Sequence, residues 1–308
     1  MALTTRRSAL TTTRSAPTTT GSTLTTRRSI LVTLGSALAG SLALPAQGAS
    51  AGERTRGPRP LWHAHAHNDY AHPRPLSDAL DHRFGSVEAD VFLVGDHLLV
   101  GHEASDLDPS RTLESLYLEP LAARVRAQHG SVYRGARRPL QLLVDIKTEG
   151  SSTYRALDRR LRRYPHLFTR YAHGRVHPGP VTVVVSGDRA ARSPMETQTE
   201  RSAFYDGRLG DLGGPASASL IPLISDNWTQ NFSWTGVGTF PDAERQKLRG
   251  ITAAAHARGQ RVRFWATPDT PGPARDALWS ELLAAGVDHL NTDDLAGLEA
   301  FLDAHPSA

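Results

Sequence analysis

Short apolar or alternating runs recur along the chain from Leu61 onward, and stretches with the apolar spacing of helices separate them. Strands that alternate with helices are typical of βα units around a parallel sheet. The expected helices cover residues 76–80, 112–128, 241–259 and 274–286. The expected strands cover residues 61–67, 86–93, 141–147, 181–187, 202–208, 220–227, 261–267 and 287–294. Parallel strands in this number, with intervening helices, predict an α/β fold, a single (β/α)8 TIM barrel whose active site lies at the C-terminal ends of the strands.

The start of the chain has a different pattern and is excluded from this barrel. It begins with a low-complexity run of Thr, Ser and Arg, which cannot supply a core. The paired arginines Arg27 and Arg28 then precede an apolar stretch over residues 30–44 and several small residues. This order resembles a twin-arginine export signal, and the apolar stretch is short for a membrane-spanning helix. We therefore expect residues 1–51 to be a leader that is removed, and residues 52–308 to be an exported domain, extracellular or in the cell envelope, with no transmembrane segment.

Charge and cysteine content narrow the classes of function. The 308-residue chain has 35 basic and 31 acidic residues, a formal net charge of +4, but five of the arginines lie in residues 1–51, which contain no acid. Without that segment 30 basic residues face 31 acidic ones, a net charge of −1, which gives no support to nucleic-acid binding. The absence of cysteine excludes disulfides, thiolate metal sites and a Cys nucleophile.

Carboxylates interrupt strands that should otherwise be aliphatic. Parallel barrel strands are buried on both faces, and side chains alternate along a strand, so Glu88 and Asp90 in "SVEADV" share one face. Asp145 in "LLVDIK" adds a third carboxylate at the end of the next strand. Such a set of oxygen ligands suits one hard divalent cation, Mg²⁺ or Ca²⁺. The alternative is a structural ion-pair network that includes Lys147.

Histidines lie near the same strand ends. In "WHAHAHNDY" the period of two places His63, His65 and His67 on one face of the first strand, and His63, farthest from its C-terminal end, is expected to be structural. Residues 95–102 predict a hairpin after the second strand, and His102 ends it. Two imidazoles beside a bound cation could split a phosphodiester, because one removes a proton from the attacking oxygen and the other protonates the leaving alkoxide.

Several motifs together resemble the PLC-like phosphodiesterase superfamily, and its altered inheritance of mitochondria protein 6 branch in particular. They are "HAHNDYAHPRPLSDAL", "SVEADVFLVGDHLLVGH", "RTLESLYLEPL", "LLVDIKTEG", "VVVSGDR" and "HLNTDDL", and the resemblance covers residues 61–302. Superfamily members include glycerophosphodiester phosphodiesterases, phosphatidylinositol-specific phospholipase C and sphingomyelinase D. The resemblance implies a metal-dependent phosphodiesterase that acts on a small-molecule or lipid phosphodiester.

The same resemblance implies roles for individual residues. Glu88, Asp90 and Asp145 match the metal ligands, and His102 matches the second catalytic histidine. The first catalytic histidine falls on His67 or His65. Substrate contacts are expected from three further side chains: Lys147, Asn68 and Trp265. The chain departs from glycerophosphodiesterases where "HND" and "RPLSD" replace their His-Arg-Gly and Pro-Glu-Asn-Thr motifs, so the alcohol or head group of the substrate stays open.

Two other interpretations use the same residues. His-x-His at the end of a first barrel strand also opens the binuclear-zinc sites of amidohydrolase and histidinol-phosphatase-like enzymes. No histidine ends the strands predicted at residues 181–227, which disfavours zinc, although His289 and Asp293 near the last strand could contribute. A non-catalytic exported binding protein is the second alternative. The sequence does not choose between water and a substrate hydroxyl as nucleophile, nor does it indicate an oligomeric state.

Overall fold

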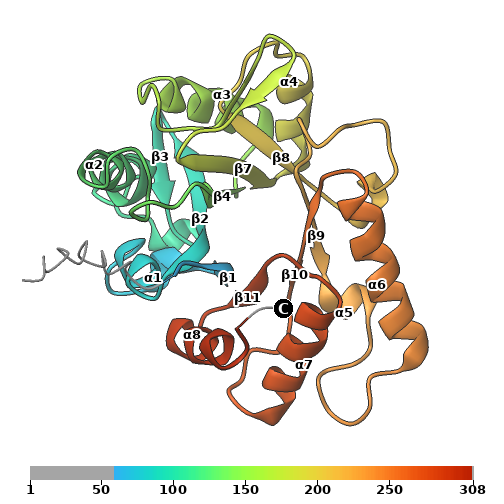
Figure 1. Ribbon diagram of the computed structural model, residues 1–308. Helices are drawn as coiled ribbons and strands as arrows, with labels where there is room; N and C mark the ends of the chain where they lie inside the picture. The colour runs from blue at the N-terminus through green and yellow to red at the C-terminus, as the bar shows by residue number, and fades with distance from the viewer. Residues whose placement is uncertain (1–58, 307–308) are drawn as a thin grey trace, which may run out of the picture. The chain divides into compact units, whose positions relative to one another are not determined.

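Parallel strands form the barrel that the sequence predicted (Figure 1). The structure is a computed structural model that describes residues 59–306, so the expected leader lies outside the described residues. These residues belong to the second of two units in the chain, Thr55–Ala308. The barrel strands are β1 (Leu61–Ala66), β2 (Phe84–Val94), β4 (Leu140–Ile146), β7 (Val181–Gly187), β8 (Ala203–Gly207), β9 (Leu223–Asn227), β10 (Arg261–Trp265) and β11 (Leu290–Thr292).

The strand order around the barrel is β10-β9-β8-β7-β4-β2-β1-β11, with parallel neighbours throughout. A parallel bridge between Arg263 and His289 joins the two ends of this order, and the N–H groups of Asp288 and His289 donate to the carbonyl of Val262 at 3.0 and 3.2 Å. The (β/α)8 prediction is confirmed. The eighth strand is shorter than residues 287–294, because regular pairing with β1 is confined to Leu290–Thr292.

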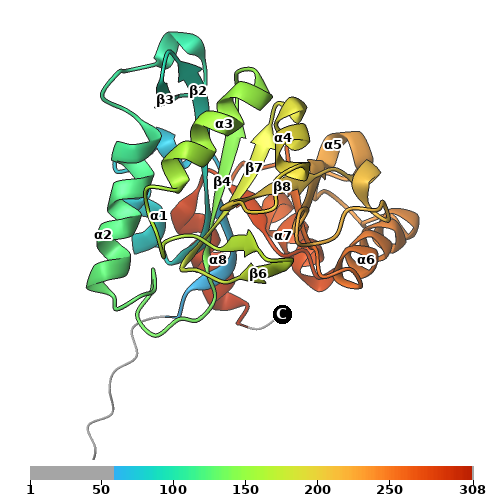
Figure 2. The same ribbon diagram turned by 90° about the horizontal axis from the view of Figure 1, so that it is seen from above.

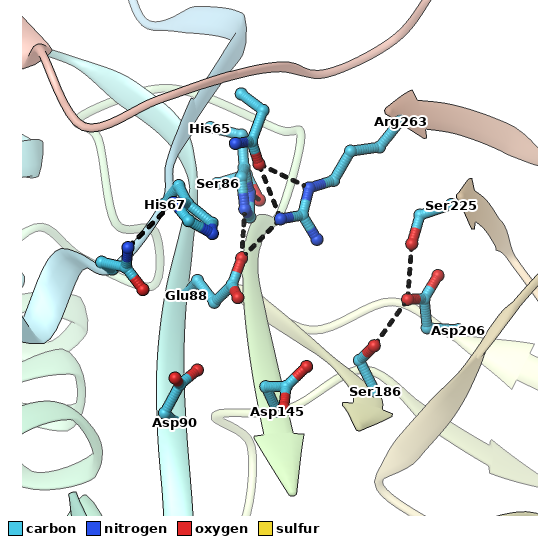
Figure 3. Close-up of polar contacts among 12 residues, drawn as sticks. His65, His67, Ser86, Glu88, Asp90, Asp145, Ser186, Asp206, Ser225 and Arg263 are labelled. Atoms are coloured by element: carbon cyan, nitrogen blue, oxygen red, sulfur yellow. Dashed lines mark hydrogen bonds and ion pairs between the residues drawn. The ribbon is translucent and has the colours of Figure 1, made fainter. Parts of the chain in front are cut away.

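The two faces of β2 differ as the alternation predicted. Val87, Ala89 and Val91 are fully buried on the face that packs on the helices. Glu88 and Asp90 point to the other side, into the barrel, as Figure 3 shows. Glu88 is 5% exposed and Asp90 is 1% exposed. Carboxylates buried to this extent require charged or hydrogen-bonded partners.

Two antiparallel hairpins extend the barrel at opposite ends (Figure 2). β3 (His97–Val100) pairs with the end of β2, which confirms the hairpin expected over residues 95–102. The second hairpin, β5 (Arg170–Ala172) and β6 (Arg175–His177), was not predicted, because each strand has three residues and an irregular burial pattern.

Helices connect the strands on the outside of the barrel (Figure 1). They are α1 (Ser77–Asp81), α2 (Glu119–Ala127), α3 (Gly150–Leu161), α4 (Arg192–Glu196), α5 (Trp228–Asn231), α6 (Asp242–His256), α7 (Pro273–Ala284) and α8 (Leu295–Ala304). No helix in the described part combines the length and the apolar character that a membrane crossing requires.

Two helical segments differ from the prediction. The helix expected over residues 112–128 is a π-helical turn, Glu114–Leu118, followed by α2. Pro120 stands in the first turn of α2, where its missing N–H is tolerated, but it could not lie inside one continuous α-helix. α3 was not predicted. Its N-terminus is capped by Glu149, whose carboxylate accepts hydrogen bonds from the N–H groups of Ser151 and Ser152 at 2.8 and 2.7 Å.

Candidate active site

Carboxylates meet where the C-terminal end of β4 pairs with β2. The strand register places Asp90 beside Asp145, and the ammonium group of Lys147 lies 3.0 Å from a carboxylate oxygen of each. Burial would lower the pKa of Lys147, but the two carboxylates raise it to about 12. Lys147 therefore stays positively charged in the barrel mouth.

Glu88 has partners from two distant strands (Figure 3). Its Oε2 accepts hydrogen bonds from His65 Nε2 at 2.8 Å and from Arg263 Nη2 at 2.6 Å. Burial would raise the pKa of Glu88, but the charge of Arg263 and the hydrogen bond from His65 hold it well below its usual range. Glu88 is thus a buried, ionised carboxylate. Sequence spacing could not identify Arg263 as its partner, because the two residues are 175 positions apart.

His65 lies inside the barrel and is not exposed. Burial and the charge of Arg263 lower its pKa to about 3, so its ring is neutral. Because Nε2 donates to Glu88, Nδ1 is free to accept from the Ser86 hydroxyl at 2.7 Å, and that hydroxyl accepts from Gln141 Nε2 at 2.8 Å. Both ring nitrogens of His65 are thus engaged with protein atoms, and neither is left free for a reacting group. The zinc alternative, which needs His65 as a metal ligand, is not supported.

His67 is the histidine of β1 that faces the barrel mouth. It follows the last residue of β1, and its side chain is 30% exposed. Nδ1 lies 2.8 Å from Asp293 Oδ1, just beyond β11. Burial lowers the pKa of His67, but the hydrogen bond to Asp293 and the charge of Glu88 outweigh burial and raise it. With Nδ1–H donated to Asp293, Nε2 is available to a reacting group.

Asn68 and Tyr70 connect His67 to the carboxylates. The Asn68 amide nitrogen lies 3.0 Å from His67 Nδ1 and 3.4 Å from Asp293 Oδ1. Since both nitrogens are donors, Asn68 donates to Asp293, which fixes the carboxylate. The Tyr70 hydroxyl lies 2.8 Å from both Asn68 Oδ1 and Asp90 Oδ2. Asn68 was expected to bind substrate. In the structure its side chain instead contacts Asp293 and Tyr70.

His102 and Trp265 lie on the rim. The N–H of Gly101 donates to the carbonyl of Asp90 at 3.3 Å, so the next residue, His102, starts beside Asp90. The His102 side chain is 60% exposed and lies 3.1 Å from Glu103. Trp265 is the half-buried last residue of β10, at the same end of the barrel. The structure therefore places both residues at the mouth. Neither side chain forms a hydrogen bond with Glu88, His67 or Lys147 in the described part of the chain.

A second polar group lies across the barrel from His67 (Figure 3). Asp206 on β8 is fully buried, and its Oδ2 accepts from Ser186 at 2.8 Å, Ser225 at 2.6 Å and Arg208 Nη1 at 2.8 Å. Asp206 and its partners were not predicted, and Asp293 was expected only as a possible zinc ligand. The alternation of side chains along the predicted strands could have indicated which polar residues point into the barrel.

The carboxylates fit a hard divalent cation in charge and chemistry. Asp90 Oδ1 is buried and has no hydrogen-bond partner among residues 59–306. Burial and the charge of Glu88 raise the pKa of Asp90 to about 6, and the same causes raise the pKa of Asp145. These shifts indicate a local excess of negative charge. Among the described residues no three possible ligands already stand at metal-binding spacing, and Lys147 lies between two of the carboxylates.

Comparisons with known proteins identify related chains. Residues 55–206 match a family model described as the AIM6-like phosphodiesterase domain, and residues 261–296 match the glycerophosphoryl diester phosphodiesterase family. The altered inheritance of mitochondria protein 6 homolog of Arthroderma benhamiae is 32% identical over 275 residues, which are 80% of this chain and 85% of that protein. The protein of that name from Eremothecium gossypii is 31% identical over 298 residues, 83% of this chain and 73% of its own. The predicted resemblance is confirmed.

A crystal structure of a glycerophosphoryl diester phosphodiesterase from Parabacteroides distasonis is also similar. It is 14% identical in sequence, with a TM-score of 0.46 over 80% of this chain and 87% of that chain.

The expected localisation is corrected by the relatives. We expected export by the twin-arginine route, from a segment that lies outside the described residues. The related chains are fungal proteins whose shared name refers to the inheritance of mitochondria, and this name does not describe a protein exported by that route. The prediction of an exported protein is therefore wrong, because a pair of arginines before a short apolar stretch is too general a pattern.

Proposed function

Since the chain belongs to the altered inheritance of mitochondria protein 6 family, we propose that it is a metal-dependent phosphodiesterase that cleaves a small-molecule or lipid phosphodiester in the barrel mouth. The observation that carries this proposal is the pair His67–Asp293 at the same strand ends as Lys147 and the three carboxylates. A proton acceptor with a free Nε2 thus lies on the same rim as the positive charge that a phosphate requires.

His67 acts as the general base in this proposal. Its Nε2 takes the proton of the attacking oxygen, and Asp293 stabilises the imidazolium that forms, because it accepts the hydrogen bond from Nδ1. Lys147 stabilises the negative charge that develops on the phosphoryl oxygens. His102, exposed on the rim, protonates the leaving alkoxide.

Glu88, Asp90 and Asp145 are the residues that would hold a divalent cation, Mg²⁺ or Ca²⁺, which would supply charge neutralisation at the phosphate. Asp90 Oδ1, buried without a partner in the described part, supports this assignment. Arg263 and His65 serve a different purpose, since they keep Glu88 ionised and in place.

The test is a panel of phosphodiesters followed by phosphorus NMR. Glycerophosphodiesters, phosphatidylinositol and lysophospholipids are incubated with the full chain, with Mg²⁺ or Ca²⁺ and with EDTA. We expect cleavage of at least one class and its loss in EDTA; an open or a cyclic phosphate product identifies water or a substrate hydroxyl as nucleophile. Cleavage that persists in EDTA would refute the metal assignment, and no cleavage of any class would refute the proposed activity.

The histidine assignments have a matched control. His67→Ala and His102→Ala should each lower kcat by about 10²–10⁴-fold, the usual contribution of general acid–base catalysis. His97, at the start of β3, is an exposed histidine on the same hairpin as His102. His97→Ala should keep parental activity, and an equal loss in His97→Ala and His102→Ala would show that His102 has no specific role.

A further inference from the structure

A cavity of about 580 Å³ lies beside the β5–β6 hairpin. Its wall combines this hairpin with the end of α3 and the segment that leads into β8, and it includes none of the residues of the candidate active site. Figure 2 shows the β5–β6 hairpin at the end of the barrel opposite to the β2–β3 hairpin. The volume lies within the range of about 300–1,000 Å³ that small-molecule sites occupy.

Arg201 brings a buried positive charge to the wall of this cavity. It is 5% exposed, and its guanidinium group lies 4.4 Å from the ring centre of Tyr171 and 5.7 Å from that of Phe204. It donates to the carbonyl of Ser219, but its Nε has no hydrogen-bond partner and it makes no ion pair with a carboxylate within residues 59–306. Burial lowers the pKa of Arg201. A buried guanidinium without a counter-ion is unfavourable, and an anion in the cavity would relieve it.

The rest of the lining is also mainly basic. Arg162 and Arg170 also line the cavity, and Glu200 is the one acidic residue of the lining. Arg162 is paired with Asp158 at 3.0 Å, whereas Arg170 is exposed and forms no ion pair with the described carboxylates. Two arginines, one buried and one on the rim, therefore lack a counter-charge.

Aromatic side chains complete the wall. Tyr164 and Phe168 meet edge to face with ring centres 6.3 Å apart, and both line the cavity with Tyr171. Such surfaces favour an apolar or planar group, and the guanidinium groups favour an oxyanion. We propose that this cavity is a second ligand site, which binds a small organic anion through Arg170 and Arg201 and packs its apolar part on the aromatic wall. This site is independent of the phosphodiesterase proposal.

Phenyl phosphate is a suitable probe, because it joins a phosphate to a planar ring. Its binding to the full chain is measured by isothermal titration calorimetry in a Lys147→Met background, which removes the phosphate-binding ammonium of the barrel mouth. We expect one site per chain in this background. Arg170→Gln should weaken it by about tenfold or more, since a hydrogen bond to a charged group is lost.

Arg175→Gln is the matched control. Arg175 is an exposed arginine on the partner strand of the same hairpin, but it does not line the cavity. Its replacement should leave the affinity unchanged. Equal affinities of the Arg170→Gln and Arg175→Gln proteins, or no binding in the Lys147→Met background, would overturn the proposal. The comparison depends on Arg170 because Arg201 is buried and its loss would also disturb packing.

Discussion

The hydrogen bond between His67 and Asp293 allows the effect of an Asp293 substitution on the pKa of His67 to be predicted. Replacement of Asp293 with Asn removes the negative charge that accepts the Nδ1–H of His67 at 2.8 Å. That hydrogen bond helps hold the pKa of His67 above its ordinary value of 6.5 against the opposite effect of burial. Asp293→Asn should therefore lower the pKa of His67 and release its ring from the tautomer that leaves Nε2 free.

The size of this shift follows from the exposure of the pair. A hydrogen bond to a charged group contributes about 1.5–3 kcal/mol. Because the Asp293 side chain is 56% exposed and that of His67 30%, solvent screening reduces this to roughly 1 kcal/mol. Loss of this contribution should therefore lower the pKa of His67. The plateau of kcat/KM should fall by about tenfold or more, a part of the 10²–10⁴-fold that general acid–base catalysis provides.

The assay is a pH profile of kcat/KM together with an NMR titration of His67. A general base works in its neutral form, so the acid limb of the profile should move to lower pH in Asp293→Asn while the plateau drops. Asp288→Asn is the control, since Asp288 accepts a hydrogen bond from His256 at the same 2.8 Å, away from the mouth. A full loss of activity with an unchanged pKa of His67, or an acid limb that moves equally in Asp288→Asn, would refute the reasoning.

Three further predictions concern Arg263, Asp69 and Lys147. Arg263→Met leaves Glu88 without its cation and should lower the free energy of unfolding by about 3–5 kcal/mol, measured by urea denaturation; a loss below about 1 kcal/mol would contradict a buried ion pair. Burial raises the pKa of Asp69 to about 6, so the folded state keeps a proton that the unfolded state loses near pH 3.8; stability should fall as pH rises from about 4 to 6, by roughly 3 kcal/mol. Asp69→Asn should abolish this slope, and a slope that survives would assign it to another group. Lys147→Met should reduce kcat far more than it changes the midpoint of thermal unfolding, because its ammonium group is part of the mouth and not of the core; the reverse result would make Lys147 structural.

Part of the site follows from residue spacing and part does not. The period of two correctly placed Glu88 and Asp90 on one inner face of β2, because strand geometry is local. The same period could not separate His65 from His67. That difference depends on where β1 ends: Ala66 is its last residue, so His67 stands in the mouth and His65 one layer below.

Two contacts of the site could not be predicted because they depend on pairing between distant parts of the chain. Arg263 meets Glu88 only because β10 closes the barrel onto β11 and β1, which brings together residues from the two ends of the chain. Asp293 stands in the predicted last strand, but its partner depends on the register Ala66 to Thr292, which no local pattern fixes. The π-helical turn before α2 likewise reflects Pro120 more than the apolar spacing that suggested one continuous helix.

The interior of the barrel is divided between apolar packing and charge, and the division has a physical consequence. On one side Leu143, Val184 and Leu223 fill the interior as a separate apolar cluster. On the other, Gln141, Ser86 and His65 form a chain of hydrogen bonds that leads to Glu88 and Arg263. Figure 3 shows the part of this chain from Ser86 to Arg263. A buried ion pair is seldom more stable than apolar residues of the same volume, so this half of the barrel is not explained by stability. It is explained if an ionised carboxylate must be held rigidly beside His67, because the buried network fixes Glu88 in both charge and position.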